Sequence, residues 1–144
     1  MGGPMSEHRE WKKGDLSARF EPPDILRIRF RGTVSLEESK WMVSLFQELG
    51  SQQAFFVVAD MTENTGYDEE GRRYASERME PEWFAGILYL KARLIHKAAA
   101  KGISLVQRLL GKPTSPVYFV SSEEEARDLL ARLRSSKQPP AAHP

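Results

Sequence analysis

Within the segment 25–31, apolar and polar residues alternate strictly from residue 26 on, and this period of two is typical of a strand with one buried face and one solvated face. Residues 16–21 form a second strand-like segment. Pro22, Pro23 and Asp24 lie between the two segments and predict a turn. We therefore expect the two strands to pair as a hairpin.

The segment 36–49 has the pattern of an amphipathic helix with marked ends. Ser35 is a favourable N-cap, and Glu38, three residues later, completes a capping box. Gly50 is expected to end this helix. Weaker helical segments cover 68–79 and 123–133, and both are acidic at their start, as the helix dipole favours. The apolar stripe of the first helix consists of Met42, Leu45, Phe46 and Leu49.

Further strands are predicted from short apolar runs. Residues 54–59 are uniformly apolar, which fits a strand covered on both faces, and 61–66 are expected to form a loop after it. Residues 84–90 and 117–120 are the other two strands, and a long helix is predicted over 92–110. The competing interpretation, a single helix from Pro81 to Leu110, would be unusually long for a domain of this size.

The predicted order is β-β-α-β-α-β-α-β-α, an α/β fold with a mixed, mostly parallel sheet and helical cover. The 144 residues suit one domain, which we place at 15–134. Residues 1–14 are predicted to be a flexible N-terminal segment. Residues 135–144, rich in Pro, Ser and Ala, are predicted to be a disordered tail.

The composition excludes several classes of function but does not indicate one directly. The chain has no cysteine and three histidines, of which only His96 lies inside the predicted domain. A catalytic triad or a zinc site needs more groups than this, so we expect no enzyme, no cofactor and no metal. The net charge of +1 and the scattered aromatics argue against nucleic acid. Without a signal-peptide pattern, a cytoplasmic location is the default expectation.

One acidic cluster surrounds the predicted loop after residue 59. Its members could in principle bind a hard cation, but the spacing of an EF-hand is absent and acids before a helix are explained by its dipole. Asp60, at the carboxyl end of a buried strand, is the best-placed functional acid, although the preferred interpretation is a turn former. The cluster consists of Asp60, Glu63, Asp68, Glu69 and Glu70.

Three stretches together resemble the STAS domain family, the fold of bacterial anti-sigma-factor antagonists. They are ILRIRFRGTVSLEES, FFVVADMTENTG and VYFVSSEEEARDLLARL, and the resemblance covers about residues 16–133. It looks closest to divergent, stand-alone members. The resemblance implies a non-enzymatic module that binds a protein partner and is switched by phosphorylation of a Ser or Thr near the helix after the third strand.

The phosphorylated motif of the family is only partly present here. Gly66 matches, Thr65 is the nearest hydroxyl, and the family's Asp and first Ser are missing. Thr65 is therefore a candidate phosphosite, with a helix cap as the alternative role. The resemblance places partner binding at this segment, with Thr62, Thr65 and Tyr67 exposed. The candidate partner-binding residues are Asp60, Thr62, Asn64, Thr65, Gly66 and Tyr67.

The net charge of the whole chain is close to zero, but basic and acidic residues are concentrated in different segments. Residues 83–122 contain six basic and no acidic residues, whereas the first 82 contain 11 basic and 16 acidic ones. At about 100° per residue, the basic residues of the long helix gather on one face, bordered by His96, and apolar residues fill the opposite half. The basic helix face consists of Arg93, Lys97, Lys101, Arg108 and Lys112.

This helix has two interpretations. It is either a core helix with a solvated basic face, or it also offers apolar surface to a second chain, a ligand or a bilayer. The resemblance to the STAS family implies a regulatory module that binds a protein partner in bacterial signalling, and this is the function that we expect. The alternative is binding of a lipid, a hydrophobic ligand or an anionic membrane surface through the helix 92–110, and a homodimer through its apolar face is a third hypothesis.

Overall fold

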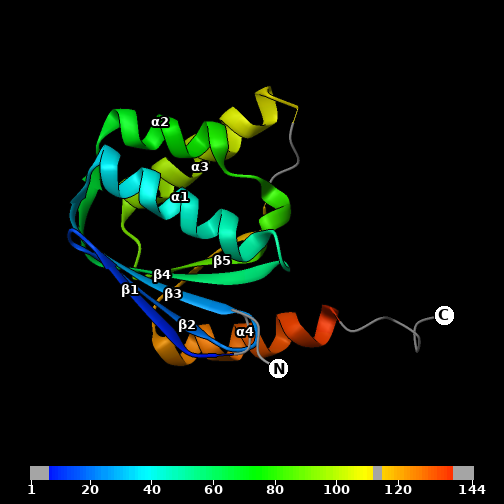
Figure 1. Cartoon of the computed structure of the whole chain (residues 1–144). Coiled ribbons are helices and arrows are strands. Elements are labelled where there is room, and N and C mark those ends of the chain that lie inside the picture. The colour runs from blue at the N-terminus through cyan, green and yellow to red at the C-terminus, as the bar shows by residue number, and fades with distance from the viewer. Residues whose placement is uncertain (1–6, 112–114, 138–144) are drawn as a thin grey trace.

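A computed structural model describes residues 7–111 and 115–137 (Figure 1). The described elements follow the predicted α/β order, with one additional strand at the start and one short 3-10 helix. The strands are β1 (Arg9–Lys13), β2 (Leu16–Glu21), β3 (Ile25–Val34), β4 (Phe55–Tyr67), β5 (Phe84–Leu90) and β6 (Val117–Val120). The helices are α1 (Leu36–Gly50), α2 (Glu69–Arg78), η2 (Pro81–Trp83), α3 (Leu94–Leu109) and α4 (Glu123–Lys137).

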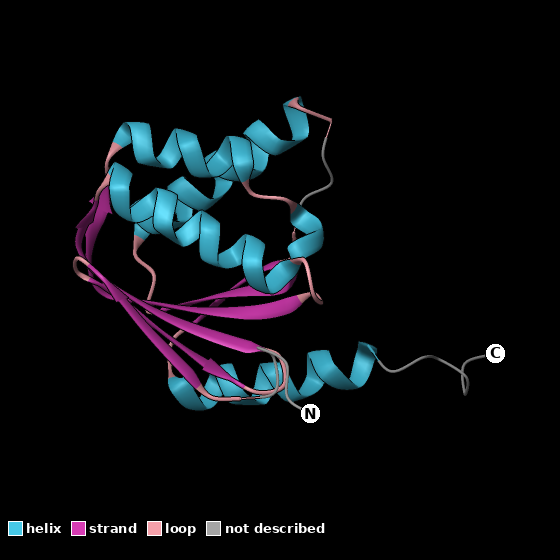
Figure 2. Ribbon diagram, viewed as in Figure 1, coloured by secondary structure: helices cyan, strands magenta, loops and turns pink. Residues whose placement is uncertain are grey.

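The strands form one sheet in the order β1-β2-β3-β4-β5-β6. β1, β2 and β3 are antiparallel neighbours, which confirms the predicted hairpin, and β3 to β6 are parallel. Figure 2 shows α1, α2 and α3 on one face of the sheet and α4 on the other. The larger hydrophobic core lies under α1 and α2, and a smaller core lies under α4.

The strand β1 corrects the prediction of a flexible segment over residues 1–14. Four of its five residues are charged, so it carries no apolar alternation that the sequence could reveal. Its backbone pairs with β2, and Trp11 packs against the larger core with the Arg9 guanidinium 4.6 Å from its ring centroid. At the other end, α4 continues to Lys137, past the predicted domain boundary at residue 134. Residues 138–144 lie outside the described part.

The helix α1 confirms the predicted capping box. The Ser35 hydroxyl accepts from the Glu38 backbone N–H, and the Glu38 carboxylate accepts from the Ser35 N–H and from the Asp15 N–H. Gly50 is the last helical residue, but the cap is Ser51. The glycine is needed because a Cβ there would lie 2.4 Å from the Cβ of Trp83.

The structure excludes the competing single helix from Pro81 to Leu110. β5 occupies Phe84–Leu90 and pairs with β4 and β6. Lys91, with a φ of 59°, turns the chain out of β5 before α3 begins at Leu94.

Candidate functional site

The predicted partner-binding residues lie on the second half of β4 instead of in a loop. β3 continues to Val34 and pairs with β4 as far as Tyr67, with two register shifts along the way. The polar stretch at 61–66 is therefore strand, because the hydrogen bonds of β3 hold it in the sheet. The sequence pattern hid this extension, since Thr, Glu and Asn are not typical of a buried strand.

Two of these residues face the interior. Asn64 is fully buried; its Nδ2 donates to the carbonyls of Gly32 and Gly66, and its Oδ1 accepts from the Gly66 N–H. Tyr67 packs against the larger core, where burial raises the pKa of its hydroxyl. The expectation that Tyr67 is exposed is therefore wrong. Asn64 stabilises the end of β4 through its buried hydrogen bonds.

Thr65 is exposed, as predicted, but it does not cap a helix. The N-cap of α2 is Asp68, whose carboxylate accepts from the Gly71 N–H at 3.2 Å. The Thr65 hydroxyl instead lies 2.8 Å from the hydroxyl of Thr33 on β3. Asp60 accepts from both the backbone N–H and the hydroxyl of Thr62, as expected of a local backbone acceptor. The expectation that it forms a turn is wrong, because it lies within β4.

Three polar pairs join β3 to β4 along this end of the sheet. Besides the threonine pair, Arg29 Nε lies 3.8 Å from Asp60 Oδ2, and Arg31 Nε lies 3.4 Å from Glu63 Oε1. The two arginine side chains are more than half exposed, and exposed pairs contribute only about 0–1 kcal/mol each to stability. We call this set the cross-strand polar row: Arg29, Arg31, Thr33, Asp60, Glu63 and Thr65.

A groove of about 400 Å³ adjoins the row on the α4 side of the sheet. Arg27 lies in it and forms ion pairs with Glu21 at 3.0 Å and with Glu123, the first residue of α4, at 2.6 Å. These arginine contacts help to lower the pKa of both carboxyls, against the opposing effect of burial. We call this the α4-side groove; its lining includes Trp11, Arg19, Arg27, Arg29, Asp60 and Glu123. Sequence reasoning missed it, although the arginines that alternate along β3 were its visible signal.

The described side chains of α3 bear on its two interpretations. The buried residues among its described side chains are Ala100, Gln107 and His96, the last of which the sequence placed at the border of the basic face. Leu94, Leu105 and Leu109 are 83%, 54% and 78% exposed. These leucines belong to the apolar half of the helix and face outward beside the basic residues Lys97, Lys101 and Arg108, as the second interpretation expects.

Polar side chains attach α3 to its neighbours. Arg93, just before the helix, donates from Nη2 to the backbone carbonyl of Asn64 on β4. Near the other end, Gln107 Nε2 donates to the carbonyl of Met79 at 3.3 Å. Arg93 is therefore a structural contact as well as a member of the predicted basic face. Lys112 lies outside the described residues.

His96 is almost fully buried at the start of α3. Its Nδ1 accepts from the Arg93 backbone N–H at 2.9 Å. Burial, and then the nearby Arg93 charge, lower the pKa of the imidazole below its ordinary value. The histidine is therefore neutral at pH 7 and is held as a backbone acceptor.

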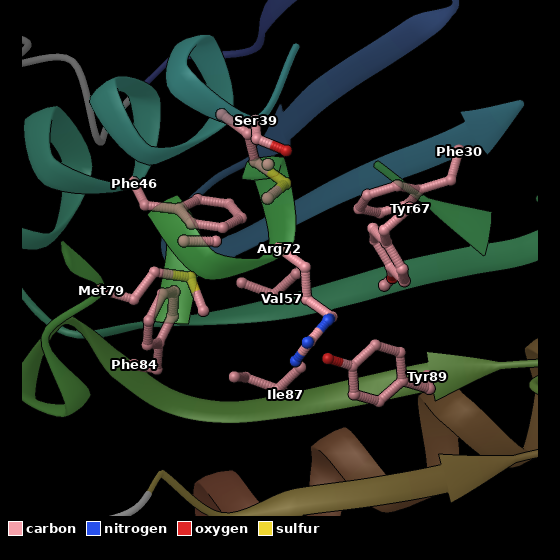
Figure 3. Close-up of a pocket in the computed structure, with 14 residues that line it drawn as sticks. Phe30, Ser39, Phe46, Val57, Tyr67, Arg72, Met79, Phe84, Ile87 and Tyr89 are labelled. Atoms are coloured by element: carbon pink, nitrogen blue, oxygen red, sulfur yellow. The ribbon is translucent and has the colours of Figure 1, made fainter. Parts of the chain in front are cut away.

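A small apolar cavity lies between the sheet and the helices α1 and α2 (Figure 3). Arg72 of α2 enters it and points toward the hydroxyl of Tyr89. Burial raises the pKa of Tyr89 to about 12, so the hydroxyl is neutral. The cavity volume is about 50 Å³, whereas ligand pockets usually measure roughly 300–1,000 Å³. In this conformation the cavity has no room for a lipid chain.

The predicted acidic cluster is spread along β4 and α2. In the described part of the chain, no three His, Asp or Glu side chains are placed to hold a metal ion together. Among the described helices, none combines the length and apolar content required to cross a bilayer.

The mixed sheet with three helices on one face and one on the other is the SpoIIAA-like fold, which confirms the predicted STAS-like class. The chain is similar to an uncharacterized protein of the DUF3478 family from Shewanella loihica PV-4, with 15% identity, a TM-score of 0.56, and coverage of 90% of this chain and 99% of that one. It is also similar to the anti-sigma factor antagonist SpoIIAA in its unphosphorylated form, with 15% identity, a TM-score of 0.51 and coverage of 87% and 98%.

A third similar structure is the Bacillus cell fate determinant SpoIIAA in its phosphorylated form, with 14% identity, a TM-score of 0.50 and coverage of 86% and 99%. At these identities the likeness shows the fold. No family model and no curated protein matches the sequence.

Proposed function

We propose that the protein is a non-enzymatic regulatory module of bacterial signalling that works in the cytoplasm by binding a protein partner. The observation that carries the proposal is the cross-strand polar row beside the α4-side groove. The row concentrates exposed charges and hydroxyls on two neighbouring strands, and the groove beside it is large enough to receive side chains of a partner. The fold shared with an anti-sigma factor antagonist supports a regulatory role.

The histidine that could have served catalysis is engaged elsewhere. His96 is buried and its Nδ1 accepts a backbone N–H, so a substrate could not reach it without displacing α3. Thr65, by contrast, is exposed and accessible to a kinase. A phosphate there would add about two negative charges to the cross-strand polar row and change which partner surfaces it fits.

The test compares charged side chains introduced in the row at Thr65, next to the row at Thr62, and on a distant helix. We expect Thr65→Glu and Thr62→Arg to weaken the binding of a purified partner, first recovered by affinity purification, by about tenfold, or 1.4 kcal/mol. Ser44→Glu, on an exposed position of α1, is the matched control and should bind like the wild type. Equal affinities for all three variants, measured by titration calorimetry, would contradict the proposal.

A second candidate function is binding of an anionic membrane or another apolar ligand through α3. The exposed leucines favour it, because large apolar side chains beside lysines are typical of helices that bind membrane surfaces. Its test is flotation with phosphatidylserine vesicles, which Leu94→Asp with Leu109→Asp should abolish. The same double variant tests a homodimer through this face, by light scattering.

A further inference from the structure

A second groove, of about 350 Å³, lies on the opposite face of the sheet from the α4-side groove, between α3 and the last strand β6. Phe119 of β6 is 39% exposed in it and stacks on Tyr89 with ring centroids 5.6 Å apart. Lys97 Nζ lies 5.4 Å from the Phe119 centroid. The groove therefore has an apolar floor and a basic wall. Its lining residues are Ala100, Lys101, Leu105, Arg108, Val117 and Phe119.

The two edges of the sheet differ in the way they meet solvent. β1, at one edge, has the sequence REWKK, and charged residues on an edge strand prevent unwanted pairing. β6, at the other edge, has the sequence VYFV and carries no charge or proline. An unprotected apolar edge strand is a template to which another strand can pair.

The backbone of β6 has hydrogen-bonding groups available on its outer side. The Pro116 carbonyl accepts from Ile87 N–H and the Val120 carbonyl accepts from Lys91 N–H, so both point toward β5. Because successive residues of a strand point their backbone groups to opposite sides, Val117 and Phe119 direct theirs away from β5. The same two residues place their side chains in the groove.

In the described structure, no ion pair neutralises the basic residues that form the wall of this groove. The ion pairs among described residues involve none of Lys97, Lys101 and Arg108. No Asp or Glu occurs anywhere from residue 83 to residue 122. A ligand that enters this groove therefore meets positive charge without the competing carboxylates that line the α4-side groove.

We infer that an acidic, extended peptide segment of a protein partner pairs with β6 as a seventh strand. Its backbone bonds the outward groups of Val117 and Phe119, an apolar side chain packs on Phe119 and Leu105, and its Asp or Glu side chains meet Lys101 and Arg108. The four residues of β6 accommodate a segment of about four to six residues. This surface does not include any residue of the cross-strand polar row, so the inference does not rest on the function proposed for that row.

The experiment selects random decapeptides displayed on phage against the immobilised chain. We expect enriched sequences that combine Asp or Glu with apolar residues. A fluorescent copy of the leading peptide should bind with a Kd raised about tenfold or more in Lys101→Glu with Arg108→Glu. Lys12→Glu with Lys13→Glu, the same charge change at exposed positions of the β1 edge, should leave the Kd unchanged.

N-methylation of alternate peptide amides separates strand pairing from simple charge attraction. Two peptides are compared, one methylated on the odd-numbered amides and one on the even-numbered amides. One of them should lose its hydrogen bonds to β6 and bind about tenfold more weakly, while the other should bind like the unmethylated peptide. Failure to enrich acidic peptides, or equal binding of the two methylated peptides, would overturn the inference. Flotation with phosphatidylserine vesicles that is lost in Lys101→Glu with Arg108→Glu, without peptide binding, would assign the groove to lipid instead. Peptide-free dimers lost in that variant would assign it to a second copy of the chain.

Discussion

The helices α1 and α3 have nearly equal lengths, 15 and 16 residues, and both carry an apolar stripe, yet they use it in opposite ways. α1 buries its stripe against the sheet, and Leu49 has no exposed surface. α3 turns Leu94, Leu105 and Leu109 outward and buries His96, Ala100 and Gln107. An amphipathic pattern thus predicts a helix, but the neighbouring elements decide which face is covered.

The contacts of α3 explain the difference. Arg93 and Gln107 donate to backbone carbonyls of β4 and of the segment after α2, and these bonds set the rotation of the helix. A rotation that buried the leucines would break both bonds and expose His96. Leu94, Leu105 and Leu109 of α3 therefore remain available for binding, whereas the described apolar stripe of α1 is used for folding.

The largest expected effect contrasts the two leucine stripes. Leu49→Ala should lower the free energy of unfolding by about 2–5 kcal/mol, because it removes buried methyl groups and leaves a cavity. Leu109→Ala should change it by less than about 0.5 kcal/mol, because that side chain is 78% exposed. Urea unfolding of both variants measures the two values, and similar losses would show that α3 buries its leucines in solution.

A glycine pair tests how closely the helices pack. At Gly71 of α2, an added Cβ would lie 2.6 Å from Ser39 Oγ and 3.2 Å from the Ser35 carbonyl oxygen, so Gly71→Ala should cost about 1–3 kcal/mol. At Gly102 of α3 the nearest atom is Arg72 Nη1 at 3.2 Å, on a flexible side chain. Gly102→Ala should therefore stabilise the protein by up to about 1 kcal/mol through helix propensity. Thermal unfolding should show a lower melting temperature for Gly71→Ala and a higher one for Gly102→Ala. A lower melting temperature for both variants would contradict the prediction.

The smallest effect concerns pH. Because the folded protein lowers the pKa of His96, the unfolded chain binds more protons just below the ordinary value of about 6.5. Stability should therefore fall as the pH drops from 7 toward 5, and this loss should be reduced in His96→Asn, which keeps an acceptor for Arg93 N–H. His8→Asn should retain the full loss. The measurement is the urea concentration at the unfolding midpoint for each variant at each pH. If this midpoint depends on pH equally in His96→Asn and in the wild type, His96 is not the source of the loss.

Strong local patterns predicted most of the fold. The capping box at Ser35, the apolar run of β4 and the short strand β6 each have a single favourable interpretation, and the structure confirms them. For β5 a long helix was the alternative, and its improbable length favoured the strand that the structure shows. β1 and the second half of β4 could not be recognised, because their strand conformation depends on backbone pairing with β2 and β3 instead of on their own side chains.

The candidate sites were predictable only in part. The polar residues after residue 59 and the acid-free basic segment were visible as composition. The geometry of these residues was not visible in the sequence. The Thr33–Thr65 pair joins residues 32 positions apart, and the groove beside β6 is formed by a strand and by the helix that precedes it. The burial of Asn64 and the outward turn of the α3 leucines likewise depend on contacts distant in sequence.

The contact between Arg93 and the Asn64 carbonyl also connects the polar end of β4 to the start of α3. Asn64 lies next to Thr65, and Arg93 leads into the helix that walls the groove beside β6. A ligand that moves this end of β4 would therefore strain or break a contact that positions the start of α3. Thermodynamic linkage then requires reciprocity: whatever factor the first ligand imposes on the affinity of the second, the second imposes on the first.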